Sequence, residues 1–67
     1  MKKFNTQDEV KQHLADGKAV HCQTNTYWAD HWHCYEECCC EGEEDTLEEM
    51  MEWIMERADL EDLWAYE

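Results

Sequence analysis

The apolar positions near the N-terminus predict a short helix. Thr6 and Glu9 have the spacing of a capping box, and Val10 and Leu14 follow on one helical face. Gly17 is expected to end the helix, because glycine readily adopts the left-handed conformation that follows a last helical turn. A helix this short needs packing against other elements to persist.

The next segment alternates apolar and polar positions, which predicts a strand over residues 18–24. Asn25 and Thr26 are predicted to form a turn after it. Residues 27–35 are aromatic and rich in histidine, and they predict one or two further short antiparallel strands with a second turn at Ala29–Asp30. Because the alternation in residues 27–35 is imperfect, a helix through this segment is the alternative.

The second half contains the strongest helical pattern. Thr46 and Glu49 repeat the capping-box spacing. One apolar stripe then recurs at helical spacing, formed by Leu47, Met50, Met51, Ile54 and Ala58. The acids on the opposite side are Glu48, Glu49, Glu52, Glu56 and Asp59. On an unbroken helix Glu61 and Asp62 would rotate onto the apolar stripe. We therefore expect a break near Asp59, which would cap a short further turn.

Together these elements predict an α+β fold: a short N-terminal helix, a small antiparallel sheet of two or three strands, and an acidic C-terminal helix followed by a short helical turn. The 67 residues are enough for a single small domain, residues 1–67. Within it, residues 1–35 are the charge-balanced helix and sheet, and residues 36–67 are an acidic loop and helix. Eight aromatic side chains are available to enlarge so small a core.

Charge divides the chain into two halves. Residues 36–67 hold fourteen of the eighteen carboxylates and one of the five Lys and Arg side chains, so the net charge of −13 lies in that half. Such self-repulsion lowers folding stability. It also makes DNA, RNA and anionic membranes poor partners and a basic protein surface a good one.

The acids are predicted to form a ridge. Carboxylates spaced four residues apart rise about 6 Å per step along one helix edge, and the acidic loop at residues 41–45 would extend that edge. The expected partner-binding residues are Glu41, Glu43, Glu44, Asp45, Glu48, Glu49, Glu52, Glu56 and Asp59, with Trp53 and Trp64 as aromatic anchors. The alternative is a solvated helix face with a solubilising loop, and tryptophans that belong to the core.

Two resemblances extend this interpretation. The opening, residues 4–20, resembles the start of many short phage and prophage reading frames, with a capped helix, a Gly-Lys turn and a strand. The acidic half resembles the small phage-encoded DNA mimics among anti-restriction and anti-CRISPR proteins, which share a charge strategy and no sequence motif. The resemblance implies an inhibitor that occupies the basic nucleic-acid-binding surface of a host defence enzyme.

Cysteine and histidine residues provide the second hypothesis. Adjacent strands would gather Cys22, His33, Cys34 and Cys38 as four zinc ligands, which would stabilise a small domain. The chain would then be a zinc-stabilised protein–protein interaction module without nucleic-acid mimicry. No Cys-x-x-Cys knuckle is present, so the competing interpretation has Cys22 and Cys34 as small buried side chains and no cofactor.

The sequence does not indicate an enzyme. His33 and Cys34 are neighbours in sequence, whereas a nucleophile and its base meet in space beside an oxyanion site. No stretch approaches the ~20 apolar residues of a membrane span, and no apolar region follows the N-terminal lysines. With five cysteines, an odd number, these features predict a reduced, cytoplasmic protein in a host cell.

Overall fold

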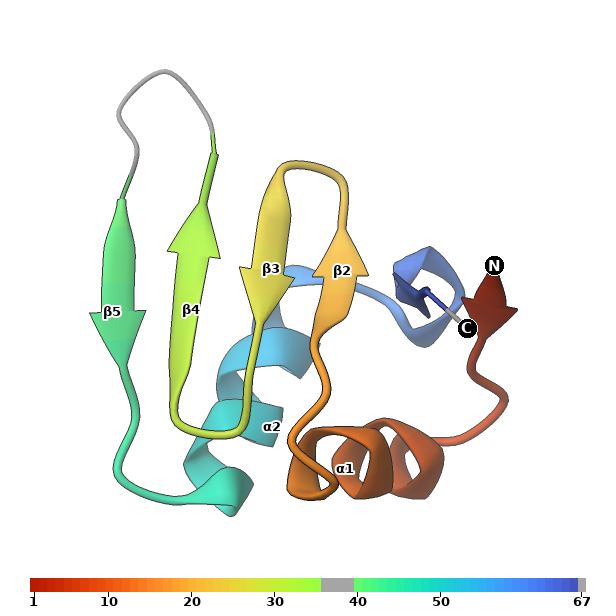
Figure 1. Ribbon diagram of the computed structural model, residues 1–67, viewed down its shortest axis with the longest axis horizontal. Coiled ribbons are helices and arrows are strands. Elements are labelled where there is room, and N and C mark those ends of the chain that lie inside the picture. Colours follow the sequence, from red (N-terminus) through yellow and green to blue (C-terminus); the bar gives the residue numbers. More distant parts are fainter. Residues whose placement is uncertain (36–39, 67) are drawn as a thin grey trace.

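The fold is a six-stranded antiparallel sheet with two α-helices (Figure 1). The computed structural model describes residues 1–35 and 40–66. In chain order the elements are β1 (Lys2–Lys3), α1 (Gln7–Ala15), β2 (Val20–Cys22), β3 (Asn25–Tyr27), β4 (His31–Cys34), β5 (Glu41–Glu43), α2 (Leu47–Arg57), a 3₁₀ turn (Leu60–Asp62) and β6 (Trp64–Ala65). The strand order is β1-β6-β2-β3-β4-β5, so the two ends of the chain pair at one edge.

The predicted sheet of two or three strands is wrong. Three strands carry no period-two signal: β1 and β6 are two residues long, and β5 reads Glu-Gly-Glu. They form because neighbouring strands supply hydrogen-bond partners. Residues 41–45, predicted to be a loop, therefore begin with strand β5, which pairs with β4 through Glu41 and Glu43.

Both predicted capping boxes are confirmed at the N-cap. The Thr6 hydroxyl accepts a hydrogen bond from the Glu9 backbone N–H at 3.2 Å, and Thr46 accepts one from Glu49 at 3.1 Å. Gly17 has φ +83°, and its N–H donates to the carbonyl of Leu14 at 2.9 Å. Helix α1 ends at Ala15, and Gly17 takes the left-handed position after its last turn, as the sequence indicates.

The predicted break at Asp59 is also confirmed, because α2 ends at Arg57 and a separate 3₁₀ turn follows. Asp59 occupies the N-cap position of that turn, but its side chain makes no capping hydrogen bond. The predicted capping role of Asp59 is therefore wrong. Leu63, after the turn, is completely buried and returns the chain to the sheet.

The tight turn between β2 and β3 lies two residues earlier than predicted. Cys22 pairs with Asn25, so Gln23 and Thr24 form the connection, and Gln23 takes φ +51°. Asn25 and Thr26 belong to strand β3. The second predicted turn, at Ala29–Asp30, is confirmed between β3 and β4.

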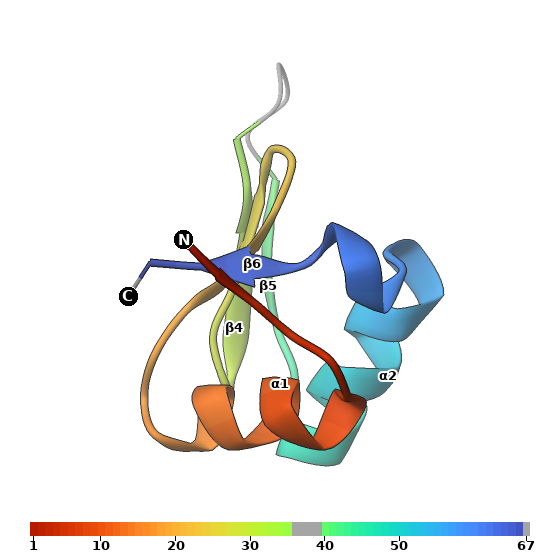
Figure 2. The same ribbon diagram turned by 90° about the vertical axis from the view of Figure 1, so that its right-hand side faces the viewer.

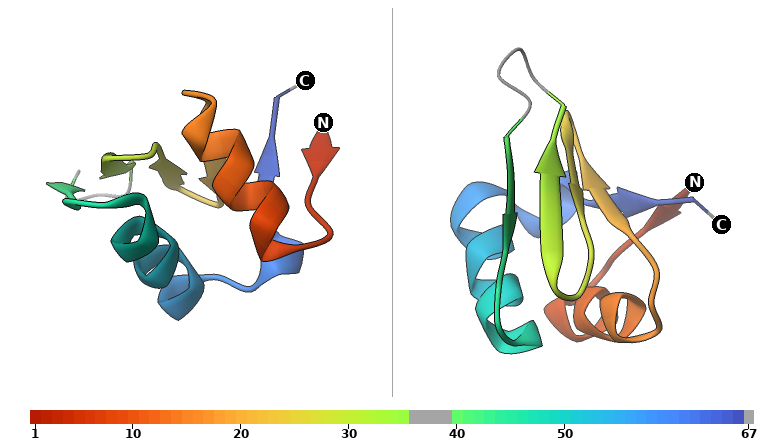
Figure 3. Two further views of the ribbon diagram at one scale, coloured as in Figure 1. Left: turned by 90° about the horizontal axis from the view of Figure 1, so that it is seen from below. Right: turned by 60° about the vertical axis from the view of Figure 1, so that its left-hand side comes forward.

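The core lies between α2 and one face of the sheet, which we call the helical face. Figure 2 shows α2 alongside this face, and the view from below in Figure 3 shows α1 crossing the end of the same layer. The buried apolar side chains are Phe4, Val10, Leu14, Val20, Cys22, Tyr27, Met50, Met51, Ile54, Leu63 and Ala65. Neither α1 nor α2, nor the short turn among the described residues, is long and apolar enough to cross a membrane.

A glycine in β5 allows two tryptophans to stack on the helical face. Gly42 pairs with Trp32 of β4, and the Trp32 ring stacks on Trp53 of α2 with centroids 4.9 Å apart. A Cβ at position 42 would meet three atoms of the Trp32 indole at 2.5–2.9 Å. The absence of a side chain in β5 therefore lets the edge strand approach the stacked rings.

Substituting Gly42→Ala should destabilise the fold by about 1–3 kcal/mol, because the new methyl group would displace the Trp32 ring from Trp53. Urea unfolding gives the change in the free energy of unfolding. The same substitution in a Trp32→Leu background is the control, and it should cost less because the clashing ring is gone. Equal costs in both backgrounds would contradict this account.

Candidate functional site

The face of the sheet opposite α2, which we call the open face, carries histidine and aromatic side chains. Among residues 1–35 and 40–66, no helix covers this face (Figure 2). Two residues that lie directly opposite each other on neighbouring strands have their side chains on the same face of the sheet. By that register and by their ring contacts, the open face includes His21, Thr26, Trp28, His31, His33, Tyr35, Glu41, Glu43, Trp64 and Tyr66.

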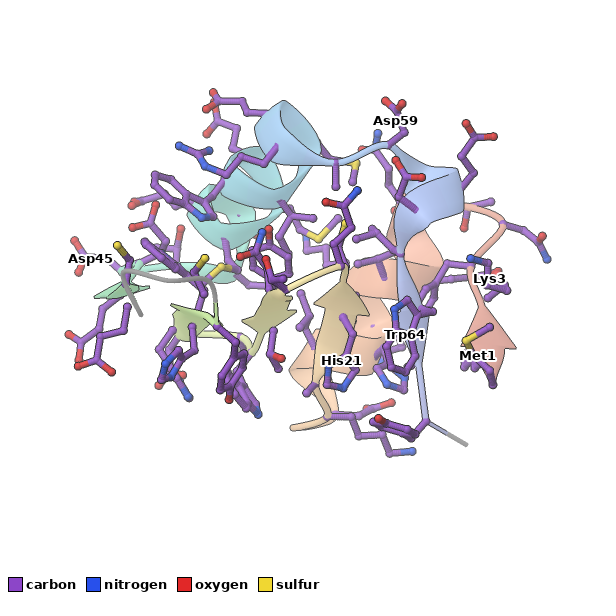
Figure 4. The ribbon with its side chains drawn as sticks, turned by 90° about the horizontal axis from the view of Figure 1, so that it is seen from above. Met1, Lys3, His21, Asp45, Asp59 and Trp64 are labelled. Atoms are coloured by element: carbon purple, nitrogen blue, oxygen red, sulfur yellow. The ribbon has the colours of Figure 1, made fainter. Side chains whose placement is uncertain are left out.

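One aromatic cluster lies where β6 joins β2. The His21 ring stacks on Trp64 with centroids 4.6 Å apart, and Tyr66 meets both rings edge-on. Figure 4 shows His21 and Trp64 together on the side away from α2. A hydrogen bond joins His21 Nδ1 and Thr26 Oγ1 at 3.1 Å. Burial lowers the pKa of His21, since a charged imidazole would lose hydration there.

Two further histidines of the open face lie in β4, and each stacks on an aromatic ring. The His31 ring lies 4.4 Å from Trp28, and the His33 ring lies 4.2 Å from Tyr35. His31 Nδ1 also donates to a carboxylate oxygen of Asp30 at 2.7 Å, and this hydrogen bond lowers the pKa of Asp30. The stacking and the hydrogen bond fix the position of the His31 ring.

The predicted acidic ridge is distributed over two sides of the sheet. Glu41 and Glu43 of β5 are exposed on the open face, directly opposite His33 and His31. The four acids of α2 are exposed on the other side of the molecule, beyond the helical face: Glu48, Glu49, Glu52 and Glu56. The carboxylates of β5 and α2 therefore do not form one straight row.

The remaining predicted acids lie between and beyond these two groups. Asp45 lies at the β5 edge, and Asp59 lies on the α2 side of the molecule (Figure 4). Both are exposed, whereas Glu44 is half-buried and donates its backbone N–H to the carbonyl of Asp30. The acidic half of the chain thus passes around the β5 edge from the open face to α2.

Two of the α2 carboxylates contact cations. Lys11 Nζ lies 3.1 Å from a carboxylate oxygen of Glu48, and this hydrogen bond from α1 lowers the pKa of Glu48. Arg57 contacts Glu56 at 3.4 Å. Within the described part of the chain, Glu49 and Glu52 form no ion pair. Their negative charges remain uncompensated on a helix whose other side is buried.

The two tryptophans predicted as anchors have different surroundings. Trp53 is half-buried between the Trp32 ring and the Arg57 guanidinium, whose Cζ lies 3.1 Å from the ring centroid. Both faces of the Trp53 ring are thus in contact with side chains of this chain. Trp64 is half-buried on the open face beside exposed Tyr66. Of the two, Trp64 is better placed to meet a partner.

The three predicted zinc ligands that the structure describes lie on both faces of the sheet. Cys22 and Cys34 are aligned across β3 on the helical face, whereas His33 is on the open face. Within residues 1–35 and 40–66, no group of three or more His, Cys, Asp or Glu is arranged to hold a metal ion. Cys38 lies outside the described residues, so the zinc site stays a prediction. Burial raises the pKa of the Cys22 thiol, as it does for a thiol within a core.

The open face was not recognised in the sequence, although its signal is present. His21, His31 and His33 all occupy polar positions in segments that alternate with a period of two. Tyr35, two residues after His33, belongs to the same face and stacks on that histidine. The missing information was the pairing of β6 beside β2, which brings Trp64 to His21.

Comparison with protein-family models, with curated proteins and with solved structures found no match to this chain.

The lowered pKa of His21 predicts a pH dependence of stability. Between the folded-state pKa and the ordinary value of 6.5, the unfolded chain binds more protons than the folded chain. The free energy of unfolding should therefore fall as the pH drops below about 6.5. Replacing His21→Phe preserves the stack on Trp64 and removes the titration. The unfolding free energy of the wild type minus that of the variant should therefore decrease from pH 7.5 to pH 5.5. Parallel pH curves would refute the assignment.

Trp53 is predicted to stabilise the fold. Trp53→Ala removes a ring that contacts both Trp32 and Arg57, and it should lower the free energy of unfolding by about 1–3 kcal/mol. Glu52→Ala, one position earlier on the exposed side of the same helix, is the control and should change it by less than about 0.5 kcal/mol. Thermal and urea unfolding measure both. A neutral Trp53→Ala variant would return this ring to the role of a partner anchor.

Proposed function

We propose that this chain is a stoichiometric inhibitor that binds the basic nucleic-acid-binding surface of a host defence enzyme. The enzyme would be a nuclease or another nucleic-acid-binding effector, of the restriction or CRISPR type. In this proposal the chain acts in the host cytoplasm, carries out no catalysis itself and contacts neither nucleic acid nor membrane directly.

The observation that carries the proposal is the fixed arrangement of the carboxylates on α2. Met50 and Ile54 are completely buried on the inner side of this helix. Glu49 and Glu52 are therefore held on a packed scaffold, and their charges do not depend on a flexible tail. Negative charges held in fixed positions can bind the Lys and Arg side chains that an enzyme uses to bind phosphates. They also speed the association of the chain with such a basic surface.

The intramolecular cations cancel only part of this field, through the contacts of Lys11 with Glu48 and of Arg57 with Glu56. Arg57, the one cation of the acidic half, lies over the Trp53 ring and donates to the Trp53 carbonyl at 2.9 Å. Lys3 donates to the carbonyl of Glu61 at 3.0 Å. Since a net charge of −13 remains after all five Lys and Arg are counted, association with a basic surface is the favoured binding chemistry.

Charge reversal on α2 tests the proposal. The immobilised chain should retain basic nucleic-acid-binding enzymes from a bacterial lysate, release them as salt rises, and release them to added DNA or RNA. Glu49→Lys/Glu52→Lys should weaken binding of the retained enzyme at least ~10-fold, because like charges would then face each other.

Glu61→Lys/Asp62→Lys is the matched control, because it changes the net charge equally at exposed positions of the 3₁₀ turn. It should weaken binding less than the α2 pair. Binding that is insensitive to salt and unaffected by nucleic acid would exclude the mimic mechanism. Equal losses in both double variants would show that net charge acts without the α2 surface.

A further inference from the structure

A hollow lies on the open face where β4 pairs with β5. Its volume is about 530 Å³, and its lining includes Trp28, His31, His33, Glu41 and Glu43. This volume falls within the ~300–1,000 Å³ of pockets that hold small ligands. The hollow thus combines aromatic rings with two carboxylates on a face that α2 does not cover.

The pairing register brings four of these side chains close together. His31 is directly opposite Glu43, and His33 is directly opposite Glu41. The positions on either side are hydrogen-bonded: Glu44 donates to the Asp30 carbonyl at 2.9 Å and Cys34 to the Cys40 carbonyl at 2.7 Å. By alternation, the two His–Glu pairs are non-hydrogen-bonded pairs, in which side chains approach more closely.

The rings of the hollow are held in place. His31 stacks on Trp28 with an interplanar angle of 9°, and His33 stacks on Tyr35 with an angle of 1°. Glu41 and Glu43 are two residues apart in β5, so they are adjacent positions on the open face, whereas Gly42 between them belongs to the helical face. The two carboxylates therefore lie side by side, beside rings whose orientation is already set. Binding would cost little ordering of these rings.

The chemistry of the lining selects a cation. None of the residues around the hollow is a lysine or arginine, and two are carboxylates. An anion would be repelled, and no group of three donors in the described chain is arranged for a metal ion. Aromatic faces and carboxylates together bind organic cations, through cation–π contact and charge-assisted hydrogen bonds.

We propose that this hollow binds an arginine side chain of the protein partner. The inference rests on the proposed function and names a place where the basic partner would be held. Arginine fits better than lysine, because its planar guanidinium stacks on rings and presents a fork of donors to carboxylates. The chain already contains one such contact, since the Cζ of Arg57 lies 3.1 Å from the Trp53 ring centroid and the guanidinium also contacts Glu56.

The test is an NMR titration of the folded chain with a tetra-arginine peptide. Saturable shifts are expected at the Trp28 indole N–H, the Gly42 amide and the imidazole resonances of His31 and His33. Glu41→Gln/Glu43→Gln should lower the affinity for the peptide by about 4–25-fold, if each exposed carboxylate–arginine ion pair contributes about 2–5-fold. Trp28→Leu should lower the affinity for the peptide by about 2–5-fold through loss of the cation–π contact.

Glu61→Gln/Asp62→Asn is the matched control, because it removes the same charge from exposed positions of the 3₁₀ turn, outside both proposed binding surfaces. It should change the peptide affinity less than the β5 pair. The β5 variants replace exposed carboxylates by isosteric amides, so the test stands even where Trp28→Leu impairs folding. A tetra-lysine peptide should bind more weakly than tetra-arginine, and equal affinities would overturn the assignment to arginine.

Shifts confined to α2, with equal losses of peptide affinity in the β5 variant and the 3₁₀-turn variant, would overturn the site and leave the proposed function standing. Shifts at the hollow that appear on concentrating the chain without peptide would identify a second copy as the occupant and would also overturn it. Failure of the proposed function has a different signature, namely the absence of salt-sensitive, nucleic-acid-competed enzyme binding in the lysate experiment.

Discussion

The packing of α2 against one face of the sheet is the interaction on which the rest of the molecule depends. Met50 and Ile54 are completely buried there, together with Val20, Tyr27 and Leu63 from the other elements. Burial of apolar surface is the main favourable term available to 67 residues that carry a net charge of −13. Because the apolar stripe of α2 must face the sheet, its carboxylates must face solvent. The same contact that makes folding possible therefore displays the charge.

The same packing determines what the open face contains. Side chains alternate between faces along each strand, so Val20 and Cys22 on the helical face require His21 on the other. In β4, Trp32 turns toward Trp53, which leaves His31 and His33 on the open face. A shift of one residue in the register would bury these histidines, and their desolvation would oppose it.

The sequence predicted well the elements whose signals are local. Thr6 and Thr46 cap their helices through side-chain atoms three residues away, and the α2 stripe lies within one element. It failed for β1, β5 and β6, because two or three residues such as Glu41–Glu43 become a strand only when β4 offers a paired edge. The ridge prediction failed in shape for the same reason. Acids adjacent in sequence are directed to opposite sides once Glu41 and Glu43 join the sheet.

This division of the acids changes what binding requires of a partner. A flat basic surface that meets Glu49 and Glu52 on α2 cannot at the same time lie flat on Glu41 and Glu43, because the sheet separates the two groups. A concave basic groove can reach both, by enclosing the β5 edge where Asp45 lies. Nucleic-acid-binding enzymes hold their substrates in such grooves and channels, and an inhibitor that inserts an acidic edge would fill one from both walls. Under the proposed function, the α2 acids would supply steering and the rings beside Glu41 and Glu43 would supply a specific contact, so both surfaces would act on the same groove.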